Sequence, residues 1–243
     1  MVDLLSSVID AHGGLDRWSA VDAVTARITI GGVAWEAKGQ PDIVGPKTVE
    51  VDTRRERIGL TPFAAADWDL ELYAAPERVV VTDREGAVVE ERTTPRSMFA
   101  GSDMTSRWDM LQAGYFIGYA LWNYLTEPFL LSYPGVEAHE IDSSEQEGDT
   151  WRRLRVTFPE TVATDNVEQV YYFDSTGIQR RKDYDLEIDG NVPVAHYTNE
   201  PKTFDGIVVP TARRVRRRME DGGADMAEDY ITIDIHHVAY RTL

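Results

Sequence analysis

The sequence predicts a mainly β protein of the α+β class, built on one strongly curved antiparallel sheet and accompanied by a central helix. Three observations lead to this prediction. Segments in which apolar and polar residues alternate recur in both halves of the chain, as in half-buried strands. Short turns rich in Gly and Asp join several of them, as in β-hairpins. Only residues 108–131 show a long helical pattern instead. We find no internal repeat or linker and expect one domain, 1–243.

The first half of the chain begins with a helical pattern and continues with strands. Residues 2–19 are amphipathic with helical spacing, and a Gly-Gly pair interrupts or ends that helix. Strict alternation in DAVTARITI (22–30) predicts a half-buried strand. The segment VAWEAKG (33–39) also carries apolar residues at alternate positions and predicts another strand. Further strands are expected around Val49 and Trp68, and residues 78–92 are typical of a hairpin.

The segment WDMLQAGYFIGYALWNYLTEPFLL (108–131) predicts a helix that is apolar on both sides and is therefore buried on both sides. One stripe carries indole and phenol rings, whose polar tips need partners. That stripe suits the wall of a cavity or a lid over a curved sheet, and a plain core helix is the alternative. The aromatic stripe consists of Trp108, Leu111, Tyr115, Tyr119 and Trp122, and the opposite stripe of Met110, Ala113, Ile117, Leu121 and Tyr124.

The second half of the chain is a continuous series of strand patterns. Alternation predicts strands over 151–158, 167–188 (a hairpin), 192–199, 204–218 and 230–240. The whole chain then has about ten strands, mostly connected by hairpins, and a sheet of this size must curl or close.

Composition excludes several classes of function. The formal net charge is −17, which disfavours binding to nucleic acids and to anionic membrane surfaces. The chain has no cysteine, so disulfides, thiolate metal sites and cysteine nucleophiles are excluded. It has no Gly-rich phosphate loop and no nucleophile elbow. We therefore expect no cofactor and no nucleic-acid partner.

The amino-terminal segment MVDLLSSVIDAHGG does not have the pattern of a signal peptide. The longest apolar run of the helical segment, 113–122, is too short for a membrane span, which needs about 20 residues. These observations predict a cytoplasmic protein with no membrane span.

Polar residues supply few candidates for chemistry. The five histidines show no metal-ligand spacing, so we expect no metal site. His196 and His237 are the better pocket candidates, because each shares a strand face with apolar residues and can titrate near neutrality. Asp109 suits the amino terminus of the central helix. The arginines of 213–218 are expected to pair on the surface with the acidic stretch 137–149.

Longer motifs resemble a known superfamily. The segments WRRLRVTFP, QVYYFD, GIQRRKDYD and AHYTNEPKTFDGIVVPTARRV, with the opening AHGGLDRW, are similar to the lipoprotein-carrier half-barrel superfamily of LolA and LolB. The resemblance is to a bacterial branch without an export signal. It implies a strongly curved antiparallel half-barrel, with helices plugging its concave face and an apolar cavity between them. In the carriers that cavity holds acyl chains, and the carriers are not enzymes.

Our leading hypothesis is a small-molecule-binding protein whose cavity takes a hydrophobic or amphipathic ligand. One alternative is a cofactor-independent isomerase, cyclase or lyase of secondary metabolism, in which tyrosine hydroxyls and a histidine act as acid and base in the same cavity. Another is an assembly module that buries the aromatic stripe in a homodimer. The expected ligand-binding residues are Trp35, Trp108, Tyr115, Tyr119, Trp122, Tyr171, His196 and His237.

Overall fold

The structure, a computed structural model, describes residues 3–146 and 148–242. In these ranges, thirteen strands form one antiparallel sheet in the order β6-β5-β4-β3-β2-β1-β13-β12-β11-β10-β9-β8-β7. The sheet is open, because its edge strands β6 and β7 each have one neighbour. The strands are β1 (Val21–Gly31), β2 (Gly45–Asp52), β3 (Arg57–Thr61), β4 (Trp68–Ala74), β5 (Glu77–Asp83), β6 (Val88–Thr93), β7 (Glu137–Gln146), β8 (Asp149–Thr157), β9 (Glu168–Phe173), β10 (Gln179–Leu186), β11 (Val192–Phe204), β12 (Ile207–Arg217) and β13 (Ile231–Thr242).

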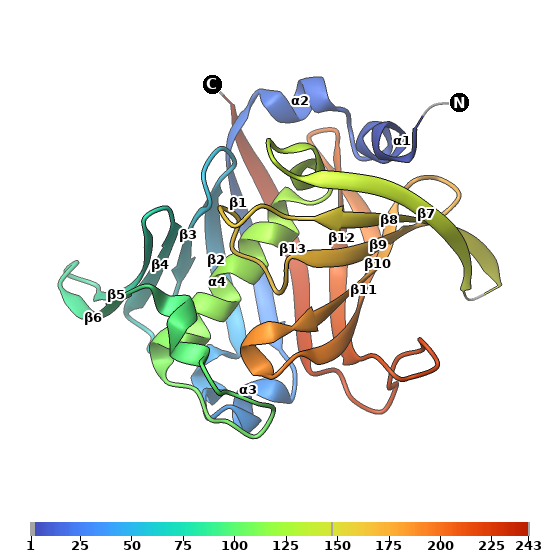
Figure 1. Ribbon diagram of the computed structural model, residues 1–243. Helices are drawn as coiled ribbons and strands as arrows, with labels where there is room; N and C mark the ends of the chain where they lie inside the picture. The colour runs from blue at the N-terminus through green and yellow to red at the C-terminus, as the bar shows by residue number, and fades with distance from the viewer. Residues whose placement is uncertain (1–2, 147, 243) are drawn as a thin grey trace.

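The curved sheet wraps around one long helix, α4 (Met110–Thr126), which crosses its concave side (Figure 1). The short helices α1 (Leu4–Ala11) and α2 (Leu15–Ser19) lie at one end of the sheet, and α3 (Ala34–Ala37) lies at the other (Figure 1). The predicted class is confirmed: the protein is mainly β, with a curved antiparallel sheet and helices on its concave face.

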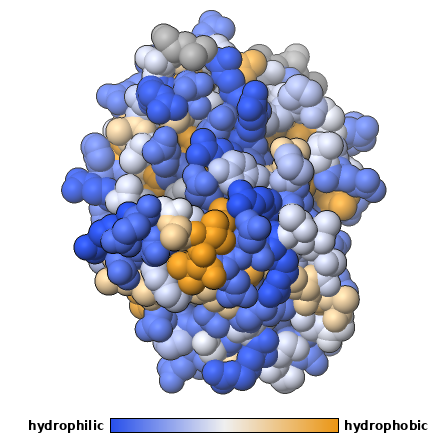
Figure 2. Space-filling model, turned by 90° about the vertical axis from the view of Figure 1, so that its left-hand side faces the viewer, coloured by the Kyte–Doolittle hydropathy of each residue, from blue (hydrophilic) through white to orange (hydrophobic). Residues whose placement is uncertain are grey.

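The surface over β4–β6 is mostly polar. Figure 2 shows this side of the molecule as largely hydrophilic, with one compact apolar patch. Alternate residues of β4 and β5, such as Leu70, Leu72 and Val79, are fully buried beneath it. The alternation of these strands therefore places their apolar side chains on the inner face, against α4.

Helix α4 begins next to Asp109, as its sequence predicts, but it ends at Thr126, five residues before the end of the segment predicted to be helical, 108–131. The Asp109 side chain accepts a hydrogen bond from the backbone N–H of Gln112, and the Gln112 side chain accepts one from that of Asp109, which forms a capping box. Pro128 follows Glu127 and disfavours a helical conformation there, so Glu127 is extended, with φ −64° and ψ 143°. Nearly every residue between these caps is buried, as the two-sided apolar pattern requires.

Two glycines bring α4 close to the sheet. A Cβ atom at Gly114 would lie 2.7 Å from Cδ1 of Leu70, and one at Gly118 would lie 2.8 Å from Cδ2 of Leu72. The G-x-x-x-G spacing therefore serves packing of a helix on β4 in this protein.

The strand predicted over 33–39 is wrong, because this segment forms α3. Gly32 turns the chain with φ 108°, at a point where a Cβ atom would lie 2.2 Å from the carbonyl oxygen of Tyr230. The next residues close one helical turn, in which the N–H of Lys38 donates to the carbonyl of Ala34 at 2.8 Å. Apolar residues two apart fit one helical turn as well as a strand, so alternation over so short a segment does not distinguish them.

The expectation that His237 lies on the isoleucine face of its strand is also wrong. Arg27 pairs with His237 while Ile28 pairs with Ile235, so His236 is an extra residue in β13. This β-bulge moves His237 to the outer face, where it is exposed and packs edge-on against Phe204.

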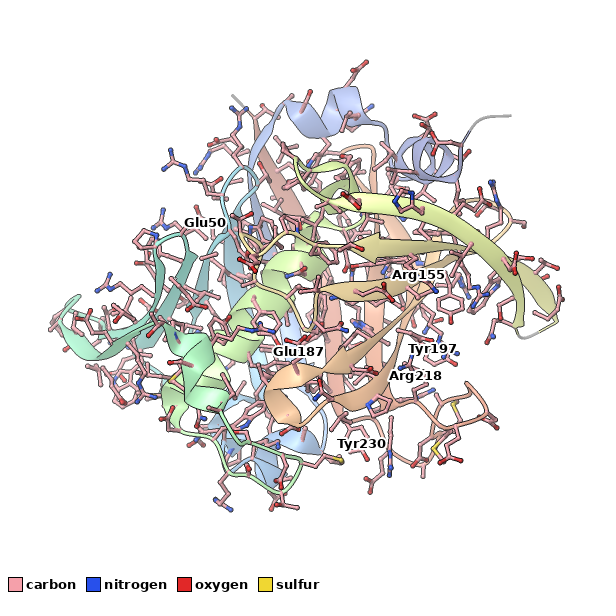
Figure 3. The ribbon with its side chains drawn as sticks, viewed as in Figure 1. Glu50, Arg155, Glu187, Tyr197, Arg218 and Tyr230 are labelled. Atoms are coloured by element: carbon pink, nitrogen blue, oxygen red, sulfur yellow. The ribbon has the colours of Figure 1, made fainter. Side chains whose placement is uncertain are left out.

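Among the residues that the structure describes, the arginines of 213–218 form no ion pair with the acidic stretch 137–149, contrary to the prediction. That stretch lies largely in edge strand β7, which four strands separate from β12. Surface arginines of this cluster bind nearer carboxylates instead. The shortest contacts are Arg214 to Asp234 at 2.7 Å, Arg216 to Asp229 at 2.6 Å, and Arg218, labelled in Figure 3, to Asp185 at 2.7 Å.

Candidate functional site

The interior of the half-barrel contains a dense aromatic cluster around α4. Side chains from the helix stack edge-on with rings from other elements, such as Trp108 against Phe116 with ring centroids 5.2 Å apart. The members expected from the sequence are deeply buried, namely Trp35, Trp108, Tyr115, Tyr119, Trp122 and Tyr171. Since the chain's own sheet and loops cover the aromatic stripe, that stripe is not available for a homodimer interface.

Four charged side chains meet beside this cluster, and we name them the ionic cluster: Glu127, Asp165, Lys182 and Arg213. The carboxylate of Glu127 forms an ion pair with Nζ of Lys182 at 3.0 Å and another with a guanidinium nitrogen of Arg213 at 3.0 Å. The hydroxyl of Tyr171 donates to the same carboxylate at 3.0 Å. All four charged residues are buried, and their charges nearly balance, as burial of ions requires.

The pKa values of the two carboxyl groups of the ionic cluster are shifted in opposite directions. Burial favours the neutral form of Glu127, but Lys182 and Arg213 outweigh it and hold the pKa of Glu127 below its usual value. For Asp165 burial dominates and raises the pKa to about 6, although Lys182 opposes the shift. The hydroxyl of Tyr119 donates to Asp165 at 3.2 Å.

His196 lies next to the ionic cluster and is fully buried. Burial, and then the charges of Arg213 and Lys182, lower its pKa well below the usual value, so the ring is neutral at pH 7. Neither ring nitrogen has a hydrogen-bond partner within residues 3–146 and 148–242. The ring instead packs edge-on against Tyr124, with centroids 4.7 Å apart.

An apolar cavity of about 140 Å³ opens from the end of the interior near α3, and we name it the Trp35 pocket. Its aromatic walls come from α3, from the residues before α4, from α4 itself and from β10. These walls are Trp35, Trp108, Phe116 and Tyr184, and Tyr230, just before β13, also lines the cavity. Aliphatic side chains of β11, β12 and β13 also line it, namely Val192, Val194, Val215 and Ile231.

A buried salt bridge lies at the edge of the Trp35 pocket. The ammonium group of Lys38 binds Asp189, in the turn η4 (Glu187–Asp189), and donates to the carbonyls of Asp103 and Met104 at 3.1 Å each. It also lies 4.9 Å from the ring centroid of Trp108. Lys38, at the end of α3, therefore connects this helix to the loop before α4 and to the turn η4 at the edge of the pocket.

The Trp35 pocket is one residue layer away from the ionic cluster. Tyr184 pairs with Val194 across β10 and β11, and both line the pocket. Two residues further along each strand, on the same inner face, lie Lys182 and His196, which also pair with each other. A molecule in the pocket would have apolar contacts on its sides and this polar layer beyond its inner end.

The structure separates the eight expected ligand-binding residues into several environments. Trp35 and Trp108 line the Trp35 pocket. Tyr115 lines a different cavity, which is more polar than the Trp35 pocket, and Trp122 donates a hydrogen bond to the carbonyl of Asp52 at 2.8 Å. Tyr119, Tyr171 and His196 lie at the ionic cluster, as described above. His237 is outside, on the convex face.

Sequence reasoning missed the ionic cluster, although β10 and β12 carried a signal for it. Lys182 lies two and four residues before Tyr184 and Leu186, so it shares their face of the strand. Arg213 lies on the same face as Val209 and Val215 for the same reason. The same period of two that places apolar residues inside places these cations inside. Glu127 and Asp165 carried no comparable signal, because they lie outside regular strands. No group of three potential metal ligands occurs within the described part of the chain.

Comparisons with known proteins address the fold. No protein-family model matches the sequence, and no curated protein is similar to it in sequence. A DUF1329 family protein from Desulfovibrio piger has a similar structure, with a TM-score of 0.53 and 16% identity over 98% of this chain and 94% of that chain. A LolA superfamily protein from Nitrosomonas europaea has a TM-score of 0.46 and 9% identity over 98% of this chain and 93% of that chain.

Within the described ranges, no helix is long and apolar enough to cross a membrane.

The open, strongly curved sheet around α4 and the similarity to the Desulfovibrio piger protein agree with the architecture that the sequence resemblance implies. The chain has an open half-barrel fold, which it shares with the Desulfovibrio piger protein.

Proposed function

We propose that this protein binds the apolar part of a small hydrophobic or amphipathic molecule in the Trp35 pocket. The observation that carries the proposal is the pocket itself, where rings from three separate segments surround an apolar space. Trp35 and Phe116, from α3 and α4, have ring centroids 5.9 Å apart. Such apolar concavities with a few polar groups at their edge are the usual form of small-molecule sites.

The volume of the pocket limits the size of its guest. A typical drug-sized ligand occupies a pocket of roughly 300–1,000 Å³. The Trp35 pocket has about 140 Å³. An apolar cavity of about 150 Å³ is large enough for benzene. The guest is therefore one ring or a short alkyl segment, and any remaining part of the ligand lies outside, past Lys38 and Asp189.

A homologous series of 1-alkanols tests this proposal by calorimetry. Each methylene group transferred from water contributes about 0.8 kcal/mol, which is about fourfold in affinity. We expect the dissociation constant to fall by about that factor per methylene from 1-butanol upward, and to stop falling when the pocket is full. An affinity that is the same for every chain length would contradict burial in a cavity.

A variant that fills the pocket locates the binding. Val215→Phe places a ring in the cavity and should abolish the alkanol response, while Val44→Phe, at an exposed valine away from the pocket, should leave it unchanged. Ala34→Leu, at the pocket wall next to Trp35, serves the same purpose if Val215→Phe does not fold. Equal alkanol binding by the filled variants and the wild type would reject the Trp35 pocket as the site.

A cofactor-independent reaction is the second candidate, and one observation favours it. Asp165 has a pKa of about 6 and accepts a hydrogen bond from Tyr119, which is the arrangement that acid–base catalysis uses. Neither residue lines the Trp35 pocket, however, so binding without turnover accounts better for the geometry. A cytoplasmic location stays a prediction from the sequence, and fractionation of the cells that produce the protein would test it.

A further inference from the structure

A second cavity, which we name the Tyr115 pocket, shares no lining residue with the Trp35 pocket. Its volume is about 370 Å³. That volume lies within the range of roughly 300–1,000 Å³ that is typical of ligand sites. The turn between β4 and β5, the turn η2 (Pro95–Phe99), α4, the loop 159–167 and η4 all contribute to its walls.

The hydroxyl group of Tyr115 lies in this wall near Arg96 and Glu77, and neither side chain completes a hydrogen bond to it. Tyr115 is 0% exposed, and its hydroxyl oxygen has no partner in the ranges that the structure describes. Burial and the nearby carboxylate of Glu77 raise the pKa of Tyr115, so the hydroxyl stays protonated at neutral pH. A buried hydroxyl costs free energy unless it is hydrogen-bonded, so this group calls for a polar guest.

The charges around the Tyr115 pocket are mostly negative. Glu77, Glu160 and Glu187 line it together with one cation, Arg96. The guanidinium group of Arg96 already has partners, because it donates hydrogen bonds to the carboxylate of Glu187 at 2.6 Å and to the carbonyl of Thr164 at 2.9 Å. Figure 3 labels Glu187, which comes from the turn after β10.

Two carboxylates of the lining, Glu77 and Glu160, lack a countercharge among the described residues, and Glu77 is the one that acts on Tyr115. Among the described residues, Glu77 forms no ion pair within 4.0 Å. Its charge is thus free to pair with a cation that enters beside Tyr115. The remaining walls include apolar side chains, among them Ala74, Val162 and Val167, which can contact a carbon skeleton.

We propose that the Tyr115 pocket binds a small organic cation with a primary ammonium group. The ammonium group would donate hydrogen bonds to the carboxylate of Glu77 and to the hydroxyl oxygen of Tyr115, while its alkyl part contacts Val162 and Val167. Hydrogen bonds between an ammonium and a carboxylate are roughly twice as strong as those between neutral groups. A neutral or anionic molecule of the same shape would leave Glu77 unpaired.

Calorimetry of the Val215→Phe variant, whose Trp35 pocket is filled, with n-butylamine, 1-butanol and butanoate tests the charge requirement of the Tyr115 pocket alone. These probes differ only in the terminal group, so their contacts with the apolar walls are nearly the same. We expect n-butylamine to bind at least tenfold more tightly than the other two, and the binding to weaken with added salt. Butanoate or 1-butanol binding as tightly as n-butylamine would overturn the proposal.

Two substitutions assign the binding to this pocket. Glu77→Gln should weaken n-butylamine binding at least tenfold, and Tyr115→Phe should weaken it about fivefold, the effect of one hydrogen bond. Glu85→Gln changes the net charge equally at an exposed turn and should have no effect. Because Glu77 lies at the protein surface, its variant keeps the test valid if Tyr115→Phe does not fold. Unchanged amine binding by Glu77→Gln would reject the site.

Discussion

The ammonium nitrogen of Lys182 lies 3.0 Å from Oε1 of Glu127, inside the curved sheet and away from solvent. Lys182 comes from β10, and Glu127 is the residue at which α4 ends before Pro128. The pair therefore fixes the end of the central helix to the far half of the sheet. Arg213 binds the same carboxylate from β12, so one anion joins α4 to two strands.

Glu127→Gln should strongly destabilise the protein. It leaves Lys182 and Arg213 buried without their shared anion, and loss of one partner of a buried ion pair costs about 3–5 kcal/mol. Urea unfolding at pH 7 measures the effect. Glu71→Gln, which removes the partner of exposed Arg57, should cost less than about 1 kcal/mol. Equal, small losses for both variants would show that the ionic cluster contributes little.

Asp165 should make the protein less stable as the pH rises from 4 to 7. Burial raises the pKa of Asp165 from 3.8 to about 6, so in this window the folded protein holds the proton more tightly than the unfolded chain. The contribution of this proton to stability is full below about pH 4 and is lost as the pH rises through about 6.

The variant Asp165→Asn isolates that contribution, because its amide does not titrate. The unfolding free energy of the wild type minus that of Asp165→Asn should fall by roughly 2 kcal/mol between pH 4 and pH 7, because the unfolded carboxyl is already partly ionised at pH 4. Denaturant titrations at each pH give the difference. A difference that rises with pH, or does not change, would contradict a raised pKa.

Gly118→Ala should destabilise the protein, although alanine favours helices by about 1 kcal/mol. The added Cβ atom would lie 2.8 Å from Cδ2 of Leu72 and 3.1 Å from its Cβ, so α4 would have to move from β4. Overpacking of this kind costs about 1–3 kcal/mol. Gly59→Ala, where the nearest atom lies 4.0 Å away, is the control and should be nearly neutral in thermal unfolding.

Lys38→Met should loosen the segment beside the Trp35 pocket. The substitution keeps a side chain of similar length but removes the ammonium group beside Trp108, its ion pair with Asp189 and its hydrogen bonds to Asp103 and Met104. Hydrogen exchange measured by mass spectrometry should become faster in residues 100–108, while Lys202→Met, at an exposed lysine, leaves it unchanged. Unaltered exchange in this segment would show that Lys38 does not hold it.

Patterns that extend over many residues predicted the fold well. Alternation over 22–30 and 230–240 corresponds to β1 and β13, and the two-sided apolar pattern of 108–131 to the buried helix α4. Such patterns are reliable because every repeat of the period must agree with the same buried face. The aromatic side chains of α4 are accordingly inside the half-barrel.

Short or interrupted patterns failed for physical reasons. The four residues of α3 are too few to separate a helical turn from a strand. In β13 one extra residue, His236, reverses the face of His237, and a bulge has no signature in residue type. The ionic cluster depends on contacts between Glu127, Lys182 and Arg213, which are far apart in sequence and which only the folded sheet brings together.

The central claim is that the aromatic interior leaves apolar room for a guest beside α4, and a crystal structure under xenon pressure tests it most directly. Xenon enters dry apolar cavities of about 150 Å³. The account predicts a xenon atom enclosed by Trp35, Phe116 and Tyr184, which is displaced when 1-hexanol is added. Side chains that fill this space, with no xenon bound between them, would contradict it.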